Sequence, residues 1–524
     1  MKKLYLSFAI ALLCFRLASA QTVTWADNVA CLLYTHCTTC HHAGGIAPFS
    51  LIDYQDAYDN ASSIQTDVTS GKMPPWPPDK AYNSFAHERL LTQQEVDLIN
   101  DWVNQGAVQG NPGNAPVPPT YSGAAQITNP DLTLRIPDFT LPTTMTSDIY
   151  RCFVVPSGLT ADQFATSLEV LPGNSAIVHH VLLYEDTTST PVNLDNNDAG
   201  PGYTCFGGTG SQASKLIGGW TPGASVYTLP TGMGIRLNAN TRIIAQVHYP
   251  MGSDGQLDST RFNFKLTTSS LREVSMAAIL NEYELLNGPL HIPANTVQSF
   301  TERYTVTGLN FTLLSIFPHM HLLGKSIKSY FINTIGDTTR LISIPDWDFH
   351  WQGSYFFRHP VKIPVNAKLY AEATYDNTTN NPDNPNSPPQ DVNWGEQTTD
   401  EMMLVFFGYL PYLPGDENII IDTSTVTSTY NNCNEFATGI SASLQQTFSV
   451  YPNPSSGKLF FKDSQNQSLE LKLYNMAGIE VEAKTIASDG YLDISALAAG
   501  VYTLRISNEN ELLFRKIIIS SQVH

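Results

Sequence analysis

The sequence has few charged residues, and no long hydrophobic run follows its first twenty positions. Charged residues make up 14% of the 524 positions, whereas about 25% is usual in soluble domains. Lys and Arg number 28 against 47 Asp and Glu, so the chain lacks the basic field that nucleic acids and anionic membranes attract. No later stretch reaches the roughly 20 apolar residues of a membrane helix. We therefore expect neither a nucleic-acid partner nor a transmembrane segment.

The first 20 residues have the pattern of a signal peptide. Lys2 and Lys3 precede an apolar run over 4–15, and the small residues 18–20 provide a cleavage pattern. We therefore expect a protein that is secreted or held at the cell surface. The hydrophobic content of 42% and aromatic content of 10% exclude a disordered chain.

The composition predicts a multidomain, mainly β protein. Short β-branched and aromatic runs between turn residues dominate the middle of the chain, as in antiparallel sandwiches, and predict strands over 177–184, 242–249, 310–321 and 402–410 among others. Near residue 92, in contrast, a helix is predicted: Thr92 is its N-cap and Glu95 completes a capping box. The predicted divisions are a signal peptide at 1–20, a small α-helical unit at 21–110, a linker at 111–130, β-sandwiches at 131–283 and 284–423, a linker at 424–446 and a small β-sandwich at 447–524.

The helical unit contains a C-x-x-C-H motif, the pattern of c-type haem attachment. Cys37 and Cys40 can form thioethers to haem, and His41 can bind its iron. Met73, in a Pro-rich segment, is the predicted sixth ligand, and His87 is the alternative. A structural or redox disulfide is the other reading of this cysteine pair.

Two further features bear on this site. His36 and His42 are interpreted as bystanders. The segment resembles small class I-like cytochrome c domains, in which a terminal helix carries a tryptophan, here Trp102.

Five histidines stand in three predicted strands: His179, His180, His248, His319 and His321. Residues two apart on a strand share a face, so His319 and His321 can hold one ion while Met320 and Leu322 face the core. Adjacent His179 and His180 would face opposite sides. A metal shared by them and His248 would need a bulge, or different ring nitrogens reaching around the ion. The spacing of the histidines alone does not distinguish between zinc, copper and iron as the bound metal.

The sequences around these histidines resemble those of the copper type II ascorbate-dependent monooxygenases, the peptidylglycine α-hydroxylating and dopamine β-monooxygenase family. The matching stretches are 179–181, 246–249, 319–325, the segment 219–234 that precedes the third histidine, and 399–404 with Met402. They stand in the family's order, and the resemblance covers about residues 131–422.

The resemblance implies two jelly-roll domains that each bind one copper ion. His179, His180 and His248 would hold the first copper, which relays electrons. The second copper would be held by His319, His321 and Met402, and catalysis would take place there. The thioether of Met402 is a soft ligand, which favours the Cu(I) state that reacts with dioxygen. Met403 is interpreted as a core residue. The implied reaction is O₂-dependent hydroxylation of a C–H bond, with ascorbate or another external donor as reductant.

Two departures from the amidating enzymes bear on the substrate. Phe317 replaces an arginine that holds a peptide carboxylate, and Phe406 replaces a tyrosine. We therefore expect an apolar or aromatic substrate, either a small molecule or a peptide, rather than a peptide to be amidated. Of the family's disulfides, Cys152 and Cys205 match one pair, whereas Cys31 and Cys433 have no assigned partner.

The last unit resembles a type IX secretion C-terminal sorting domain. The resemblance rests on the stretches 451–454, 473–478, 500–504 and 516–519. The alternative interpretation is an ordinary small β-sandwich module. The resemblance implies export through the periplasm, recognition by the type IX machinery and cleavage near residues 440–450.

Together the motifs predict a secreted copper monooxygenase that takes its electrons from a fused haem through the first copper. Two alternatives remain open: a surface copper-binding or electron-transfer protein without enzymatic activity, and a glycan-binding module, since jelly rolls also occur in lectins.

Overall fold

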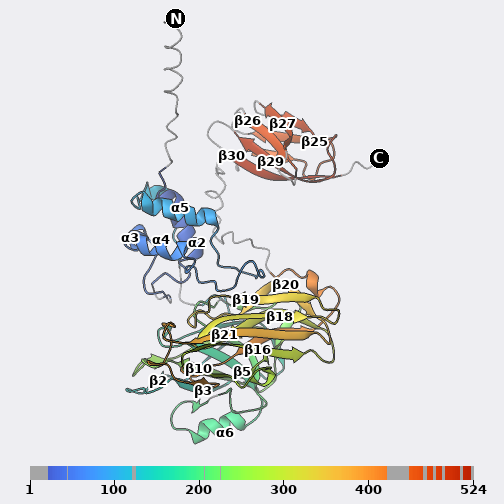
Figure 1. Cartoon of the computed structure of the whole chain (residues 1–524). Coiled ribbons are helices and arrows are strands. Elements are labelled where there is room, and N and C mark those ends of the chain that lie inside the picture. Colours follow the sequence, from blue (N-terminus) through green and yellow to red (C-terminus); the bar gives the residue numbers. More distant parts are fainter. Residues whose placement is uncertain are drawn as a thin grey trace.

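The computed structural model describes most of the chain. The described residues are 22–43, 45, 47–120, 125–205, 207–224, 226–421, 448–463, 469–475, 480–486, 490–507 and 512–520. The predicted signal peptide, the 424–446 linker and Cys433 lie outside them. Within them, a helical unit, two two-sheet β units and a small β unit follow one another along the chain (Figure 1). The multidomain, mainly β prediction is confirmed.

The last α-helix of the helical unit, α5, is also its longest. Thr92 caps that helix, and Glu95 completes the capping box, as predicted. Trp102 is fully buried in the core of the unit, and its indole N–H donates to the carbonyl of Val108. The elements of the unit are η1 (Trp25–Val29), α2 (Ala30–His36), α3 (Tyr54–Asp59), α4 (Ala61–Thr69), α5 (Gln93–Asn104) and η2 (Pro112–Asn114).

The first β unit packs two sheets against one apolar core. One sheet has the order β1-β12-β4-β9-β13 with β8 on β4, the other β6-β3-β10-β5-β7, and β2 pairs with β11. The predicted disulfide between Cys152 and Cys205 is confirmed, and it joins β3 to the segment after β6. The elements are β1 (Leu132–Arg135), β2 (Phe139–Thr140), β3 (Ile149–Pro156), β4 (Gln163–Leu171), β5 (His180–Asp186), α6 (Thr190–Asn197), β6 (Tyr203–Thr204), β7 (Lys215–Trp220), β8 (Tyr227–Thr228), β9 (Met233–Leu237), β10 (Arg242–Tyr249), β11 (Leu257–Asp258), β12 (Arg261–Thr267) and β13 (Arg272–Glu273).

The second β unit also has two main sheets, ordered β14-β23-β17-β20 and β16-β21-β18-β19, with the pair β15-β22 beside them. Strand β14 precedes residue 284, where the sequence placed the start of this unit, yet β14 pairs with β23. The elements are β14 (Ser275–Leu280), η3 (Glu282–Glu284), β15 (His291–Ile292), β16 (Thr296–Thr305), β17 (Phe311–His319), β18 (Gly324–Ile332), β19 (Thr338–Ile344), β20 (Tyr355–Ile363), β21 (Lys368–Asn377), β22 (Val392–Asn393), β23 (Leu404–Pro411) and η4 (Asp416–Asn418).

The last unit is a small sandwich with its own core. Its sheets have the orders β24-β25-β28 and β27-β26-β29-β30. The strands are β24 (Phe448–Tyr451), β25 (Lys458–Asp463), β26 (Leu469–Tyr474), β27 (Glu480–Ile486), β28 (Gly490–Asp493), β29 (Gly500–Ser507) and β30 (Leu512–Ile519).

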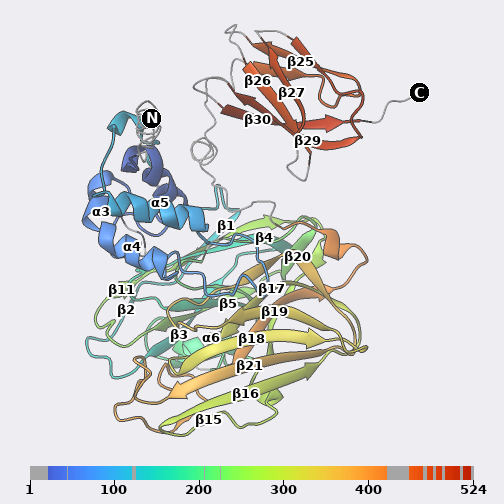
Figure 2. The ribbon, with the colours of Figure 1, turned by 45° about the horizontal axis from the view of Figure 1, so that its top comes forward.

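The helical unit lies against the two large β units (Figures 1 and 2). Residues 73–89, here called the docking strap, run from α4 toward α5 over the second β unit. Phe85 of the strap is only 1% exposed and belongs to the core of that unit. The backbone N–H of Ala86 donates to the carbonyl of Phe356 over 2.7 Å. The strap is therefore part of the second sandwich's packing rather than a free connection.

Candidate metal centre

Three imidazoles converge at one end of the β6-β3-β10-β5-β7 sheet. His180 begins β5 and His248 lies on β10, and the register pairs them directly. His179 precedes the strand, and its backbone N–H donates to the carbonyl of His248 over 2.9 Å. One potential ligand atom from each residue lies within 4.8 Å of the others.

The position of His179 resolves the problem of adjacent histidines. The predicted strand over 177–184 begins only at His180, so strand alternation does not apply to its neighbour. The two rings therefore reach the same space without a bulge between them.

A buried carboxylate holds His248. Nε2 of His248 lies 3.0 Å from Oδ2 of Asp148, which also accepts a hydrogen bond from the Thr398 hydroxyl, while Oδ1 of the same carboxylate accepts from the Met251 N–H. Burial opposes ionisation of Asp148, but these hydrogen bonds keep its pKa well below its usual value. The carboxylate therefore stays ionised and accepts a hydrogen bond from Nε2–H of His248, which leaves a free lone pair on Nδ1 of His248.

Two ring nitrogens of this group are buried and have no hydrogen-bond partner among the described residues: Nε2 of His179 and Nδ1 of His248. Leaving a buried polar atom unpaired costs about 1–3 kcal/mol. A metal ion bound by the three rings would satisfy such nitrogens.

The imidazoles are uncharged at neutral pH. Burial, followed by the neighbouring imidazoles, lowers the pKa of His179 to about 3, and burial lowers that of His319 to about 4. The same causes place the pKa values of His180 and His321 well below 6.5. Neutral imidazole is the form that binds a metal.

The second pair of histidines lies in the other β unit. His319 ends β17 and His321 follows the strand, with ring centroids 5.1 Å apart. Met320 is fully buried in the core, as predicted. Leu323 rather than Leu322 joins it there, because the strand ends at His319 and its alternation stops.

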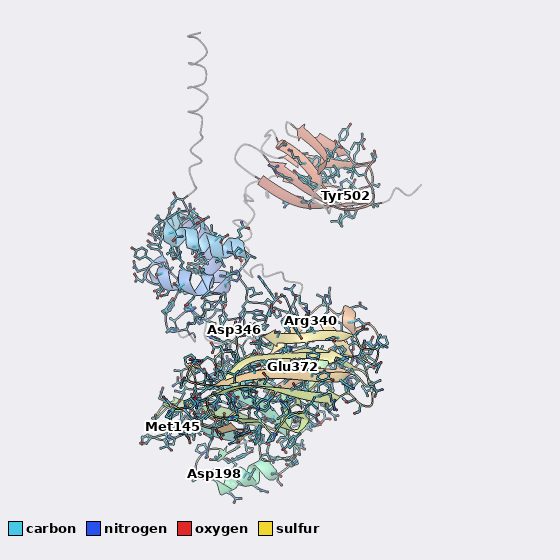
Figure 3. All side chains as sticks on the ribbon, in the orientation of Figure 1. Met145, Asp198, Arg340, Asp346, Glu372 and Tyr502 are labelled. Carbon is cyan, nitrogen blue, oxygen red and sulfur yellow. A yellow bond between two sulfur atoms is a disulfide. The ribbon has the colours of Figure 1, made fainter. Side chains whose placement is uncertain are left out.

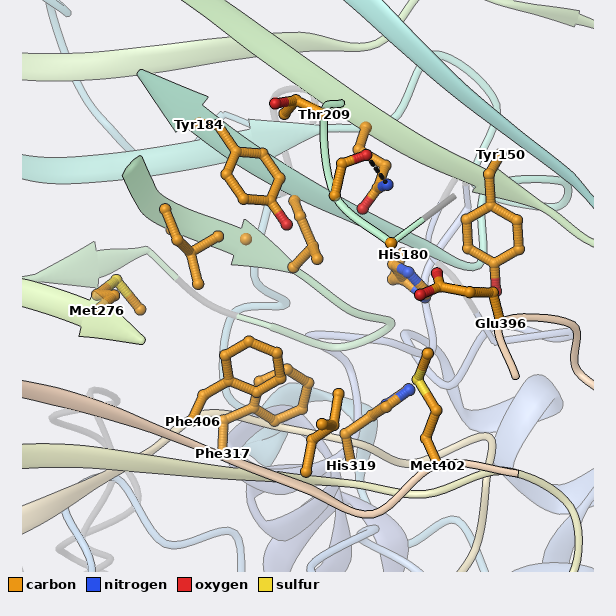
Figure 4. A pocket seen from close by; sticks show the side chains of 18 of the residues that line it. Tyr150, His180, Tyr184, Thr209, Met276, Phe317, His319, Glu396, Met402 and Phe406 are labelled. Carbon is orange, nitrogen blue, oxygen red and sulfur yellow. Dashed lines mark hydrogen bonds between the residues drawn. The ribbon is translucent and has the colours of Figure 1, made fainter. Parts of the chain in front are cut away.

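Met402 is brought to these histidines by a buried glutamate. The Glu401 carboxylate accepts hydrogen bonds from the backbone N–H groups of His321, Leu323 and Met402. Strand pairing sets His319 opposite Leu404, two residues after Met402. Figure 4 shows the side chains of His319 and Met402 pointing toward each other from neighbouring segments. Met403 is 1% exposed in the core, as predicted.

The two groups of histidines face each other across the junction of the β units. The ring centroids of His180 and His319 are 6.3 Å apart. His180, His319 and Met402 line the same cavity of about 540 Å³ (Figure 4). The rings of Phe317 and Phe406 stack in its wall with centroids 5.5 Å apart. Among the described residues, no lysine or arginine lines this cavity.

Sequence reasoning missed four residues that support these groups. They are Asp148, Phe349, Gln352 and Glu401. The ring of Phe349 stacks on His179 with centroids 4.6 Å apart, and the Gln352 Oε1 lies 2.6 Å from Nδ1 of His319. The sequence contained a signal for Phe349 and Gln352. Both lie in residues 347–352, a loop that also contains two tryptophans and a histidine.

The C-x-x-C-H residues form one turn after α2. The N–H of His41 donates to the carbonyl of Cys37, and both Cys37 and Cys40 are free, half-buried thiols. Burial raises the pKa of the Cys37 thiol to about 12, with Cys40 contributing. Nδ1 of His41 lies 3.1 Å from the Phe49 carbonyl, an arrangement that leaves Nε2 available.

The other haem-related residues are placed as follows. His36 contacts the Glu95 carboxylate and His42 the Thr38 carbonyl. Met73 is half-buried and its N–H donates to the Asp67 carbonyl, whereas His87 is exposed.

Comparison with known families matches three parts of the chain. The copper type II ascorbate-dependent monooxygenase N-terminal domain matches residues 132–253, and the C-terminal domain of that family matches residues 291–432. Together they cover about half of the chain. The secretion system C-terminal sorting domain matches residues 449–520.

The chain therefore belongs to the copper type II ascorbate-dependent monooxygenase family, whose members are oxidoreductases that use O₂. It ends in a type IX sorting domain, which makes it a secreted or cell-surface protein. Among the described residues, no helix combines the length and the apolar character needed to cross a bilayer.

Other comparisons add little. No curated protein matches the chain. Similar solved structures include a Faecalibacterium prausnitzii beta-glucuronidase, with 9% identity, a TM-score of 0.13, and coverage of 43% of this chain and 37% of that chain. A Ruminococcus gnavus beta-glucuronidase has 9% identity, a TM-score of 0.12, and coverage of 43% and 36%. The alignments thus span little more than a third of those enzymes, and such scores establish no shared fold.

Proposed function

We propose that this protein is a secreted monooxygenase that hydroxylates a C–H bond of a small apolar or aromatic molecule. His179, His180 and His248 would hold one copper ion, and His319, His321 and Met402 would hold the second. The observation that carries the proposal is the buried imidazole group with unpartnered nitrogens on His179 and His248.

The donor atoms fit the two roles. Three neutral imidazoles suit a copper ion that cycles between oxidation states, and a thioether at the second site favours Cu(I). When bound, copper supplies the reactivity toward O₂. The residues of this chain hold the ions and shape the cavity: Glu401 positions Met402 against the histidines, and Asp148 orients His248.

The cavity supports the substrate class. Its wall contains the stacked Phe317 and Phe406 rings, and none of its described lining residues is a cation that would pair with a carboxylate. An apolar or aromatic molecule would gain by displacing water from this surface. A peptide carboxylate would lack a charged partner there.

We further infer that a c-type haem on Cys37, Cys40 and His41 supplies electrons, with Met73 as its axial ligand. Two observations support this fit. Both thiols are free despite their close spacing, so the alternative disulfide is not formed. The carbonyl of Phe49 accepts from Nδ1 of His41, which orients Nε2 toward a metal.

The test combines metal analysis with labelled O₂. The purified protein is expected to bind two copper ions and covalent haem, and to transfer one ¹⁸O atom into a product from a panel of small aromatics. Met402→Leu is expected to abolish this incorporation with an unchanged haem spectrum. His41→Ala is expected to remove the haem spectrum and leave both copper ions bound.

Two results would overturn the proposal. If no more than a trace of copper binds after reconstitution, the metal sites are wrong. If both copper ions bind but no substrate or O₂ is consumed with reductant present, the protein is a copper-binding or electron-transfer protein instead.

A further inference from the structure

A buried carboxyl group without a partner lies beneath a segment that reaches the cavity of the candidate metal centre. Glu302 on β16 is fully buried, and neither of its carboxylate oxygens has a hydrogen-bond partner among the described residues. β16 is an edge strand of its sheet. Residues 281–288, here called the flap, connect β14 to β15 and cover part of this edge. The flap therefore separates Glu302 from water.

The flap connects the buried carboxyl with the cavity. Leu285 forms an isolated antiparallel β-bridge with Glu302 and packs against the core of the second β unit. Glu282 and Tyr283, at the other end of the flap, line the cavity. Only Glu284 separates the cavity wall from the β-bridge. Displacement of the flap from β16 would therefore also change the cavity wall.

The flap is attached to the edge of β16 by hydrogen bonds near the surface. The N–H of Leu286 donates to the carbonyl of Thr301 over 2.8 Å. The Asn287 side chain donates to the carbonyl of Ser299 and accepts from the N–H of Thr301, both over 2.9 Å. Tyr283 is 86% exposed and Leu286 is 51% exposed. Segments with exposed hydrogen bonds and little buried apolar surface open most readily.

The surroundings of Glu302 disfavour its negative charge. Burial, followed by repulsion from Glu282 and Glu284 of the flap, raises the pKa of Glu302 well above its usual value. Tyr375 of β21 is uncharged as well, because burial raises its pKa well above 10. A buried carboxylate without a partner is costly, so the group either stays protonated or gains water.

Among the described residues, no positive charge compensates for Glu302. Arg303, the next residue of β16, is exposed on the opposite face of the strand. Lys328 pairs with Glu372 on the outer face of the same sheet, where Figure 3 shows Glu372. His291 of β15 lies against Asn393, with Nδ1 at 2.9 Å from the amide oxygen. Glu302 therefore fits this core only in its protonated form.

We propose that the flap is a pH-dependent gate of the cavity, which stays on β16 while Glu302 is protonated and opens when Glu302 loses its proton. The proton passes to water, and water then hydrates the carboxylate at the edge of the sheet. Glu282 and Tyr283 leave the cavity wall together with the flap. Access to the cavity thus increases as the pH rises. The gate is a property of the fold and does not require a bound metal.

The first experiment measures hydrogen exchange in the full chain at about pH 5 and about pH 9, with rates corrected for the intrinsic effect of pH. Exchange over residues 281–288 is expected to be at least about tenfold faster at the higher pH, because burial of an unpaired charge disfavours the closed state by about that factor or more. Strand β21 is the internal reference and is expected to stay protected. Flap exchange that does not depend on pH would overturn the proposal, and so would equal opening of β21, which would indicate unfolding of the whole unit.

The second experiment tests whether Glu302 is the group that titrates. Glu302→Gln is expected to keep the flap protected at both pH values, because the amide cannot ionise. Glu302→Leu, which places an apolar side chain in the same core, is a second variant and is expected to behave alike. Glu273→Gln, at an exposed glutamate of the first β unit, is the matched control and should keep the wild-type response. A wild-type response in a folded Glu302 variant would show that another group opens the flap.

The third experiment tests whether the flap controls access to the cavity. The probe is N-phenyl-1-naphthylamine, an uncharged aromatic fluorophore, and its association rate is measured by stopped-flow fluorescence. The rate is expected to be severalfold higher at the higher pH in the wild type and unchanged by pH in Glu302→Gln. Equal rates in the wild type, or no binding, would overturn the gate.

Failure of this inference is distinguishable from failure of the proposed function. All three measurements are made without added copper or reductant, so their outcome does not depend on a metal site. A protein that binds no copper contradicts the proposed function and leaves the gate in place. A flap that stays closed at every pH contradicts only the gate.

Discussion

At the scale of single residues, Asp148 connects the two β units to the imidazole group. Its carboxylate contacts Nε2 of His248 in its own unit and accepts from the Thr398 hydroxyl of the second unit. One carboxylate thus sets the tautomer of a candidate ligand and joins the two halves of the cavity. Carboxylate partners of this kind raise the basicity of a metal-binding histidine.

Asp148→Ala is therefore expected to weaken copper binding at the first site by about 10–100-fold, because His248 loses its orienting partner. Copper at the second site should remain. Titration against a competing chelator, followed by electron paramagnetic resonance, measures both sites. Asp138→Ala, at an exposed carboxylate, is the control, and equal affinities in the two variants would contradict the assigned role.

Glu302 on β16 is a buried carboxyl that the proposed function does not use. It is fully buried, and neither carboxylate oxygen has a hydrogen-bond partner among the described residues. Burial, with added repulsion from Glu282 and Glu284, raises its pKa well above the usual value. Its contribution to stability is thus present below about pH 4.5 and is lost as the pH rises through the folded-state pKa.

Glu302→Gln is expected to remove this loss of stability at high pH. At pH 8 the variant should be more stable than the wild type by about 1–3 kcal/mol, because an unpaired carboxylate no longer has to be buried. At pH 4 the two proteins should be similar. Urea unfolding at both pH values measures the difference, with Glu273→Gln at an exposed glutamate as the control, and a pH-independent difference would contradict the prediction.

At the scale of elements, the positions at which strands begin and end determine where the candidate ligands lie. The predicted strand over 242–249 agrees with β10, but those over 310–321 and 402–410 end or begin elsewhere. His321 and Met402 both lie just outside a strand. Backbone that leaves the ladder is free to turn, and Glu401 accepts the N–H groups that the ladder no longer satisfies.

The disulfide between Cys152 and Cys205 stabilises the sheet that carries His180 and His248. It closes a sequence separation of 53 residues, so replacing both cysteines by serine is expected to cost about 4 kcal/mol on the chain-entropy estimate. Copper should still bind in the folded double variant, because backbone pairing of β5 with β10 places both histidines. Thermal unfolding and copper analysis test this, and loss of copper from the folded variant would show that the disulfide positions the site.

At the scale of the whole molecule, the sorting unit is structurally separate from the oxidoreductase part. Its strands pair with one another in two sheets over their own core. The docking strap, in contrast, buries Phe85 in the second β unit. The helical unit is thus integrated with the second β unit, whereas the sorting unit serves export.

A chain that ends at residue 446 is therefore expected to bind the same amount of copper as the full chain. Elemental analysis of both proteins, with circular dichroism as a check of folding, makes the comparison. A chain that also lacks residues 22–90, which include the docking strap, should lose stability because part of the apolar core of the second β unit becomes exposed. A clear drop in copper after removal of the tail alone would contradict the separation.

The fold class, the order of the units and the family could be predicted from the residues alone. These follow from local patterns: alternation, capping, turn residues and motifs such as C-x-x-C-H need no knowledge of distant contacts. It also placed Met320 and Met403 in the core, because residues of a strand alternate between faces.

The distance between the two histidine groups, and the residues that support them, could not be predicted in this way. The contacts of Asp148 with Thr398, of Thr221 with Gln352 and of Arg89 with Gly223 each join different units. Such contacts arise from the packing of separate sandwiches, which no local periodicity encodes. The physical reason is that a strand's pattern specifies which face it buries but not which surface comes to lie against it.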